Sequence, residues 1–252
     1  MTAEEAPKEK SGRVVFVTGG SRGIGLACAR WFQAAGDEVA VSYREVSPDD
    51  VEGPEGTSPL VCVRCDVTSP SDVERAFGEI ESTLGPVEVL VCAAGITDDT
   101  LLLRMSEERW ASVLETNLTG VYRSCKRALG PMVRARSGRI VLVSSVVAFL
   151  GSAGQANYGA SKAALVGFAR SLAREVGSRS ITVNVVAPGV VATDMIAALG
   201  TERAAALTAM VPLGRQAAPG EVAAAIGFLA SSEASYITGA VLAVDGGLGM
   251  GH

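Results

Sequence analysis

The chain has 252 residues, 48% of them hydrophobic and 19% charged, with a formal net charge of −5 at pH 7. This composition excludes an intrinsically disordered chain and suits one large or two small α/β domains. The negative balance gives no electrostatic attraction to nucleic acid or to anionic membranes, so neither is an expected partner.

Residues 1–12 are mostly charged or small and carry no apolar segment, so we expect a flexible arm before a single domain over residues 13–252. The arm lacks the apolar core of a secretion signal, and no apolar run is long enough to span a bilayer. The expected location is therefore cytoplasmic.

The numbers of histidines and cysteines limit the kinds of catalytic and metal sites that the chain can form. The only histidine is His252, at the chain end, so we expect neither a Ser-His-Asp triad nor a histidine-rich metal site. The odd number of cysteines, five without a signal sequence, indicates reduced thiols. Cys62 and Cys65 are spaced as C-x-x-C, but at that spacing they would point to opposite faces of a strand. We therefore predict no metal site.

The predicted elements begin with a buried strand at residues 14–17, a glycine-rich turn and a helix that ends at Gly36. Glycines let the backbone approach a pyrophosphate, and the start of a helix offers free N–H groups. The residues expected to bind a dinucleotide phosphate are Gly19, Ser21, Arg22, Gly23, Ile24 and Gly25. The turn also matches the G-x-S-x-G elbow of hydrolases, which the lack of an interior histidine excludes.

The second strand, residues 38–43, ends at Arg44. In a dinucleotide fold this end faces the adenosine ribose, where an arginine accommodates a 2′-phosphate and an acid selects a free hydroxyl. Arg44 therefore favours NADPH over NADH. The alternative is a solvated surface arginine, since Glu45 follows directly.

Residues 45–59 are expected to form a loop before a third strand at 60–64, which leads to Asp66 and Val67. Asp66 either bonds the adenine amino group or acts in a turn or cap before Pro70.

A predicted helix at 71–84 precedes a fourth strand at 87–91. A long helical region around 110–133 contains Asn117, and the next strand, 139–143, ends at Ser144 and Ser145.

The following helix carries Tyr158 and Lys162, four residues apart and therefore on one face. A cation beside a phenol favours the phenolate, so we expect Lys162 to lower the pKa of Tyr158 from its usual value near 10. Tyr158 would then donate a proton at neutral pH, and Ser145 could meet the same substrate atom. The alternative is an ordinary surface contact.

Further strands are expected at 181–186 and 240–244, with a mobile flap over 190–215 and a last helix at 221–229. Strands and helices alternate at the spacing of parallel βαβ units. The prediction is an α/β fold: a single-domain Rossmann-type, doubly wound parallel sheet of about seven strands with helices on both faces.

With its motifs in this order, the chain resembles the short-chain dehydrogenase/reductase family over residues 13–252. The motifs that carry the resemblance are Thr18-Gly19-x-x-x-Gly23-x-Gly25, Asn117, Ser145, Tyr158-x-x-x-Lys162 and Pro188-Gly189-x-x-x-Thr193.

The resemblance implies a role for each catalytic candidate. Tyr158 would be the proton donor, and Lys162 would lower its pKa and bind the nicotinamide ribose. Ser145 would hydrogen-bond the substrate carbonyl, and Asn117 would hold a water in a proton relay from Lys162. Hydride would pass from NADPH to the carbonyl carbon while Tyr158 protonates the oxygen.

The remaining cofactor contacts implied by the family are Val191 and Thr193 on the nicotinamide carboxamide, and the backbone of Ala94 and Gly95. Here the chain departs from the family, which usually has Asn-Asn-Ala-Gly where this sequence has Cys-Ala-Ala-Gly at 92–95. Because both asparagines are missing, we expect a looser sheet or cofactor site but an active enzyme.

Within the family, residues 154–158, 183–189 and 234–239 most resemble 3-oxoacyl-[acyl-carrier-protein] reductases of fatty acid synthesis, and the chain ending resembles the actinobacterial type. This implies NADPH-dependent reduction of 3-oxoacyl to 3-hydroxyacyl thioesters by a homotetramer. Arg136 and Arg179 would dock the acidic carrier protein, or would simply be solvated arginines at helix ends. The alternatives are a reductase of an acyl-CoA, polyketide, steroid or quinone, and a non-catalytic dinucleotide sensor.

Overall fold

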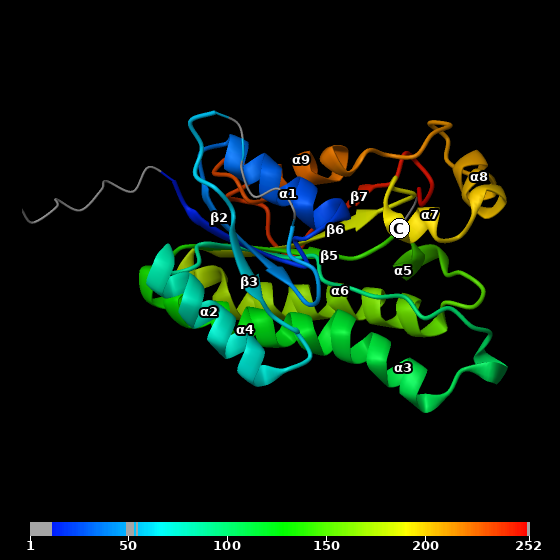
Figure 1. Cartoon of the computed structure of the whole chain (residues 1–252), viewed down its shortest axis with the longest axis horizontal. Coiled ribbons are helices and arrows are strands. Elements are labelled where there is room, and N and C mark those ends of the chain that lie inside the picture. Colours follow the sequence, from blue (N-terminus) through cyan, green and yellow to red (C-terminus); the bar gives the residue numbers. More distant parts are fainter. Residues whose placement is uncertain (1–11, 49–52, 54, 251–252) are drawn as a thin grey trace, which may run out of the picture.

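The computed structural model describes residues 12–48, 53 and 55–250 (Figure 1). Within them seven strands form one parallel sheet in the order β3-β2-β1-β4-β5-β6-β7, which confirms the predicted fold class. The strands are β1 (Val14–Thr18), β2 (Glu38–Tyr43), β3 (Val61–Arg64), β4 (Val89–Cys92), β5 (Gly138–Val143), β6 (Ile181–Pro188) and β7 (Val241–Val244). The predicted arm, apart from its last residue, lies outside the described residues, as does His252.

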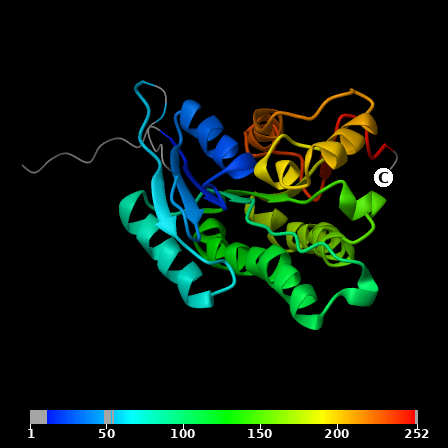
Figure 2. The same cartoon turned by 45° about the vertical axis from the view of Figure 1, so that its right-hand side comes forward.

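Two helical layers cover the sheet (Figures 1 and 2). Helices α1 (Gly23–Ala34) and α9 (Pro219–Leu229) pack on one face, and α2 (Pro70–Thr83), α4 (Gly120–Ala135) and α6 (Ala156–Val176) pack on the other. The central strands are continuous runs of buried residues, because a parallel sheet with both faces covered has no solvated side.

Cys62 and Cys65 were predicted to point to opposite faces of the third strand, and the structure confirms it. Cys62 packs against the core on the α1 and α9 face, whereas Cys65 lies in the core on the α2, α4 and α6 face. Both thiols are free, and the described residues contain no cluster of metal-ligating side chains.

The shorter helices lie mainly beyond the carboxyl ends of the strands. They are α3 (Glu107–Leu114), α5 (Val147–Leu150), α7 (Asp194–Ala197) and α8 (Thr201–Ala209), with the 3₁₀ turns η1 (Leu102–Arg104) and η3 (Gly177–Arg179). In Figure 2, α7 and α8 lie at the same end of the molecule as α5. The segment 190–215, predicted as a flap, therefore contains two short helices.

Strand order sets the place of the site. The chain runs outward from β1 through β2 to β3, then returns to β4 on the other side of β1. At such a switch point the loops after β1 and β4 diverge and leave a crevice at the carboxyl edge, where doubly wound sheets bind ligands.

Besides boundary shifts such as that of β4, predicted at 87–91, two elements differ from the sequence prediction near the site. The helical region around 110–133 is divided into α3, a π-helical turn η2 (Glu115–Thr119) and α4. Strand β6 continues to Pro188 instead of ending before it, because the proline carbonyl still accepts a hydrogen bond from Val146 N at 2.8 Å. In the part of the chain that the structure describes, no helix is long and apolar enough to cross a membrane.

Candidate active site

The glycine turn after β1 forms a close backbone cradle. Gly19 has a positive φ of 68°, and a methyl group on it would lie 2.7 Å from Ala94 Cα. A methyl group on Gly25 would lie 2.2 Å from the Gly19 carbonyl oxygen. Only glycine fits at these two positions, and the loops after β1 and β4 come together there.

The first turn of α1 is open to an anion. Its N-cap residue Arg22 makes no side-chain cap, and no acidic residue lies in the turn. The free N–H groups and the helix dipole suit a phosphate at this point. The residues present therefore fit the pyrophosphate of a dinucleotide.

Ser42 on β2 supports this turn and was not a candidate from the sequence. Its hydroxyl accepts a hydrogen bond from Gly19 N at 3.0 Å, and its carbonyl accepts one from Gly20 N at 3.0 Å. Ser42 is 1% exposed, so the cradle is fixed from within the sheet. A polar residue in the apolar run of β2 was the available signal.

Three arginines surround the ends of β2 and β3. Arg44 is paired with Glu45 at 2.8 Å, and both side chains are exposed. Arg64 Nε donates to the Arg44 carbonyl at 3.3 Å, and Arg75 Nη2 donates to the Arg64 carbonyl at 2.7 Å. The pairing with Glu45 matches the alternative left open for Arg44, and Arg75 is paired with Asp72 and Glu79.

Asp66 makes the turn that the sequence allowed. Its Oδ1 accepts hydrogen bonds from Thr68 N at 2.9 Å and from Thr68 Oγ1 at 2.7 Å. The helix cap that follows is Ser69, whose hydroxyl accepts from Asp72 N. Val67 is buried and lies against α4. An adenine contact of Asp66 stays a prediction.

Ser145, Tyr158 and Lys162 converge beyond the ends of β4 and β5. Ser145 and Tyr158 are 8% and 9% exposed, and the Ser145 side chain is near enough to the Tyr158 hydroxyl to lower its pKa. The Ser145 hydroxyl accepts from Val147 N at 3.2 Å. The structure therefore brings together the hydroxyl pair predicted from two separate motifs.

Lys162 lies beneath this pair. Its Nζ donates to the Val143 carbonyl at 2.8 Å and lies 5.7 Å from the centroid of the Tyr158 ring. The side chain is buried, and burial lowers the pKa of Lys162 to about 8. The alternative of a surface contact between Tyr158 and Lys162 is therefore wrong.

The expected lowering of the Tyr158 pKa is also wrong for the protein on its own. Burial of the ring is the largest cause and raises the pKa of Tyr158; the neighbouring Ser145 side chain acts in the opposite sense, and the Asp99 carboxylate raises it further. Lys162 is not among the groups that shift this pKa, so desolvation of the phenolate decides its direction.

Asn117 holds the crevice together from the π-helical turn. Its side chain accepts from Ile96 N at 2.9 Å and donates to the Ile96 carbonyl at 3.0 Å and to Ser161 Oγ at 3.1 Å. A methyl group on Gly95 would lie 3.3 Å from both Asn117 Oδ1 and Lys162 Nζ. Asn117, Gly95 and Lys162 are therefore neighbours.

Two further serines are buried beside the site: Ser144, which the sequence placed at the end of the fifth strand, and Ser161, which it did not single out. Ser161 Oγ donates to the Tyr158 carbonyl at 2.7 Å, and Ser144 Oγ donates to the Lys162 carbonyl at 2.8 Å. They anchor α6 at both catalytic candidates. Ser161 could have been found as a polar residue at i+3 from Tyr158 on an apolar helix face.

Val191 and Thr193 cover the glycine turn. Val191 is buried and bridges to Ala217, and Thr193 Oγ1 donates to the Val191 carbonyl at 3.3 Å. A methyl group on Gly23 would lie 3.4 Å from Thr193 Cγ2. The segment after β6 is therefore placed against the predicted phosphate cradle.

The departure at 92–95 leaves strand pairing intact. Cys92 is paired with Thr18 on β1 and with Leu142 on β5, and Ala94 N donates to Thr18 Oγ1 at 3.4 Å. A looser sheet or cofactor site stays a prediction.

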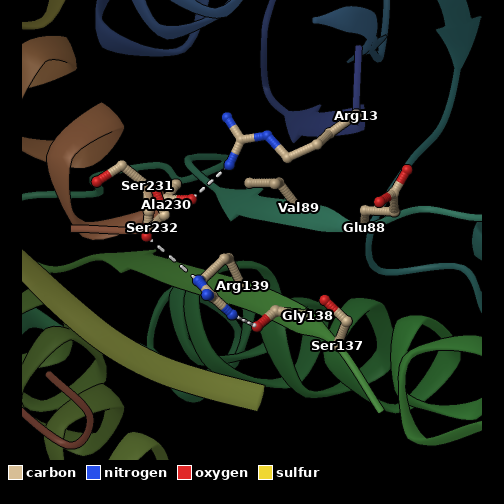
Figure 3. A pocket seen from close by; sticks show the side chains of 9 residues that line it. All are labelled: Arg13, Glu88, Val89, Ser137, Gly138, Arg139, Ala230, Ser231 and Ser232. Atoms are coloured by element: carbon tan, nitrogen blue, oxygen red, sulfur yellow. Dashed lines mark hydrogen bonds between the residues drawn. The ribbon is translucent and has the colours of Figure 1, made fainter. Parts of the chain in front are cut away.

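A cavity of about 270 Å³ lies at the opposite, amino edge of the sheet (Figure 3). Its two guanidinium groups already have partners: Arg13 donates to Asp37 and to the Ala230 carbonyl, while Arg139 donates to the carbonyls of Gly138 and Ser231. No pair of catalytic hydroxyls converges there. We therefore assign the candidate site to the carboxyl edge.

Comparison with known proteins agrees with this geometry. Residues 19–249 match the family model described as enoyl-(acyl carrier protein) reductase. The chain is 48% identical to the 3-oxoacyl-[acyl-carrier-protein] reductase MabA of Mycobacterium avium over 241 residues, 95% of this chain and 91% of that protein. It is 46% identical to the 3-oxoacyl-[acyl-carrier-protein] reductase FabG of Escherichia coli over 243 residues, 95% and 98% of the two chains.

The chain belongs to the short-chain dehydrogenase/reductase family. The family resemblance predicted from its motifs is thus confirmed, and with it a place among oxidoreductases that use a nicotinamide dinucleotide. Membership of the family predicts the cofactor at the crevice between the β1 and β4 loops and the substrate at the hydroxyl pair of Ser145 and Tyr158.

Proposed function

We propose that the protein reduces 3-oxoacyl thioesters, carried on acyl carrier protein, to 3-hydroxyacyl thioesters in fatty acid synthesis. The observation that carries this proposal is the buried hydroxyl pair of Ser145 and Tyr158 with Lys162 beneath it. Two neighbouring hydroxyl groups can both donate a hydrogen bond to the same carbonyl oxygen of a substrate. The names of the relatives, over nearly the whole chain, support the same substrate class.

NADPH is the proposed cofactor, and it supplies the hydride that forms the new C–H bond. The residues proposed to hold its phosphates are Gly19, Ser21, Arg22, Gly23, Ile24 and Gly25. At the adenosine end, Arg44 and Arg64 supply positive charge for a 2′-phosphate. Asp66 and Val67 would contact the adenine, and Ala94, Gly95, Val191 and Thr193 would contact the nicotinamide half.

The chain's own residues would provide the proton and the electrostatic support. Ser145 Oγ hydrogen-bonds the substrate carbonyl, and Tyr158 donates its hydroxyl proton to the same oxygen as charge develops there. The Lys162 ammonium stabilises the phenolate that remains. Asn117 holds the helical turn beside Gly95, so a water-mediated path can return a proton to Lys162.

The family description suggests a second substrate class, an enoyl thioester. Hydride addition to its C=C bond places charge on the distant thioester oxygen, whereas a 3-oxoacyl group carries its oxygen on the carbon that accepts hydride, where the hydroxyl pair can donate to it; the pair therefore favours the 3-oxoacyl group. Comparing NADPH oxidation with a 3-oxoacyl thioester and with the matching enoyl thioester separates the two. We expect turnover of the first only.

Arg136 and Arg179 are proposed to dock the acidic carrier protein. Arg136 ends α4 in a left-handed conformation, and its Nη2 donates to the Ser178 carbonyl at 3.1 Å, next to Arg179. The two exposed guanidinium-bearing residues therefore belong to adjoining segments. A homotetramer and a cytoplasmic location stay predictions.

The test of the proposed chemistry is Tyr158→Phe, which removes the donor hydroxyl and keeps the ring. We expect turnover of a 3-oxoacyl thioester to fall by about 1,000-fold or more, since general acid catalysis contributes roughly that much. NADPH binding, measured by fluorescence titration, should stay close to wild type. Tyr236→Phe, at a fully exposed tyrosine, is the matched control. Retained turnover in Tyr158→Phe would exclude this mechanism.

A further inference from the structure

We propose that Asn157 is a positioning residue of this reaction: its buried side-chain amide ties the backbone of Tyr158 to the loop after β4, which aligns the proton donor with the cofactor. The proposal rests on the proposed function, in which Tyr158 is the proton donor. It gives Asn157 a role that neither the sequence motifs nor the names of the relatives assign.

The Asn157 amide joins backbone groups from three segments. Its Oδ1 accepts a hydrogen bond from Tyr158 N at 2.8 Å, and its Nδ2 donates to the Asp98 carbonyl at 3.1 Å. A longer contact, 3.5 Å, runs from Nδ2 to the Arg109 carbonyl in α3. The side chain is 0% exposed, so its removal would leave the Tyr158 N–H without a partner inside the protein.

The start of α6 depends on this amide. The first N–H groups of a helix have no partner within the helix, and the side chain of the N-cap residue commonly accepts from one of them. Here the N-cap residue Gln155 makes no such bond, and its Nε2 donates instead to both carboxylate oxygens of Asp99, at 3.1 and 3.0 Å. Asn157 therefore supplies the acceptor for the N–H of Tyr158.

The Tyr158 carbonyl is connected to the same loop by a second route. Ser161 Oγ donates to this carbonyl at 2.7 Å and accepts from Asn117 Nδ2 at 3.1 Å. Asn117 in turn bonds the N–H and the carbonyl of Ile96, at 2.9 and 3.0 Å. Both polar groups of the Tyr158 backbone are thus linked through side chains to residues 96–98.

This loop is also where the proposed function places the cofactor. Ala94 and Gly95, which would contact the nicotinamide half, come directly before Ile96. The proposed reduction delivers hydride to a carbonyl carbon and the Tyr158 proton to the oxygen bonded to it, so the two donors must be aligned on adjacent atoms. A misplacement of about 1 Å can lower a rate by about 100-fold. A buried link between the loop and Tyr158 provides that alignment.

The test compares Asn157→Ala with the matched control Asn184→Ala. Asn184 is also 0% exposed, and its amide also joins two backbone groups, donating to the Ile237 carbonyl at 2.8 Å and accepting from Ala240 N at 3.1 Å, next to the amino end of β7. Each variant loses one buried amide, so we expect similar falls in Tm. The kcat for a 3-oxoacyl thioester should fall by about 10- to 100-fold in Asn157→Ala only.

Two further measurements separate positioning from a general loss of structure. Single-turnover reduction isolates the chemical step and should slow by the same factor as kcat in Asn157→Ala, with KM for NADPH close to wild type. Asn157→Asp provides a second variant, because it keeps an acceptor for Tyr158 N and loses the donor to the Asp98 carbonyl. A helix cap alone would be restored by the aspartate, whereas the proposed link would not, so we expect Asn157→Asp to stay slow.

Three outcomes would overturn the role of Asn157. They are a wild-type kcat in Asn157→Ala, an equal loss of kcat in Asn184→Ala, and a wild-type kcat in Asn157→Asp. If the wild-type protein does not reduce a 3-oxoacyl thioester, the proposed function itself is overturned instead.

Discussion

Each edge of the sheet holds a cation, and the two cations differ in burial and in partners: the Arg13 side chain is 36% exposed, whereas Lys162 is buried. At the amino edge, Arg13 donates to both carboxylate oxygens of Asp37, which is 7% exposed, and to the Ala230 carbonyl at the end of α9 (Figure 3). At the carboxyl edge, Lys162 is 5% exposed and donates to one backbone carbonyl, that of Val143. No carboxylate forms an ion pair with it over the described residues.

This contrast separates a structural charge from a functional one. The partly exposed Arg13 guanidinium has a carboxylate and a helix-end carbonyl as partners, which largely offset its desolvation. A buried ammonium with a single neutral partner is destabilising, so its retention needs a chemical reason. Proton transfer at Tyr158 provides that reason under the proposed function.

The largest effect is expected from Lys162→Met. Turnover should fall by about 100-fold or more because the phenolate loses its cation. Stability should rise: the lowered pKa of Lys162, about 8 against 10.5, corresponds to roughly 3 kcal/mol. Loss of the hydrogen bond to Val143 offsets about 1 kcal/mol of that. A higher Tm with lost activity is the expected result.

The pH dependence of that gain provides its check. Below about pH 8 both folded and unfolded wild-type chains carry the charged lysine, so the variant's advantage in unfolding free energy is complete. Between pH 8 and 10.5 the folded chain releases this proton first, and the advantage shrinks. Denaturant unfolding at pH 7 and pH 10 measures the difference; an equal gain at both would contradict a buried charge.

Arg13→Met should do the reverse at the amino edge. It leaves the buried Asp37 carboxylate without its cation, and we expect a loss of about 1 to 2 kcal/mol in unfolding free energy, less than for a fully buried pair because the Arg13 side chain is 36% exposed. The kcat of the folded protein and KM for NADPH should not change, because the residue lies at the edge opposite the site. Arg215→Met, in an exposed pair with Glu221, is the control. It should cost about 0.5 kcal/mol or less. If Arg13→Met loses NADPH affinity, the proposal that the amino edge has only a structural role would be contradicted.

The smallest effect is expected from Ala93→Asn, which restores one asparagine that the family usually has. The side chain would add a polar contact between the loops after β1 and β4, where Ala93 N donates to the Thr18 carbonyl at 3.2 Å. We expect a gain of about 1 kcal/mol, in Tm or in NADPH affinity. If Tm and NADPH affinity both match wild type, the absence of the asparagines weakens neither stability nor cofactor binding.

Much of the fold followed from local pattern. Buried β-branched runs and helix-length spacers alternate along the chain, and both periods are set by backbone geometry. The boundaries of β2 matched the prediction, because its ends are marked by Asp37 before and Arg44 after. The π-helical turn at Asn117 was missed, since its five residues carry no composition that differs from an ordinary helix.

The candidate site divides in the same way. Tyr158 and Lys162 were found because a spacing of four on a helix fixes their neighbourhood. The contact between Asp99 and Gln155 joins residues 56 positions apart, and that of Asn117 with Ser161 joins residues 44 apart. Such pairs depend on how the loop after β4 packs on α6, and the spacing of residues along the sequence does not predict that packing.

The sequence by itself determined the parallel α/β architecture, the glycine cradle and the identity of the catalytic candidates, because each depends on residues that are close along the chain. The tertiary structure alone decided how those groups are charged. Packing buries Tyr158 and Lys162, and burial raises the pKa of the phenol and lowers that of the ammonium. Protonation depends on desolvation and on charges from distant segments, so it was decided only when the chain was folded.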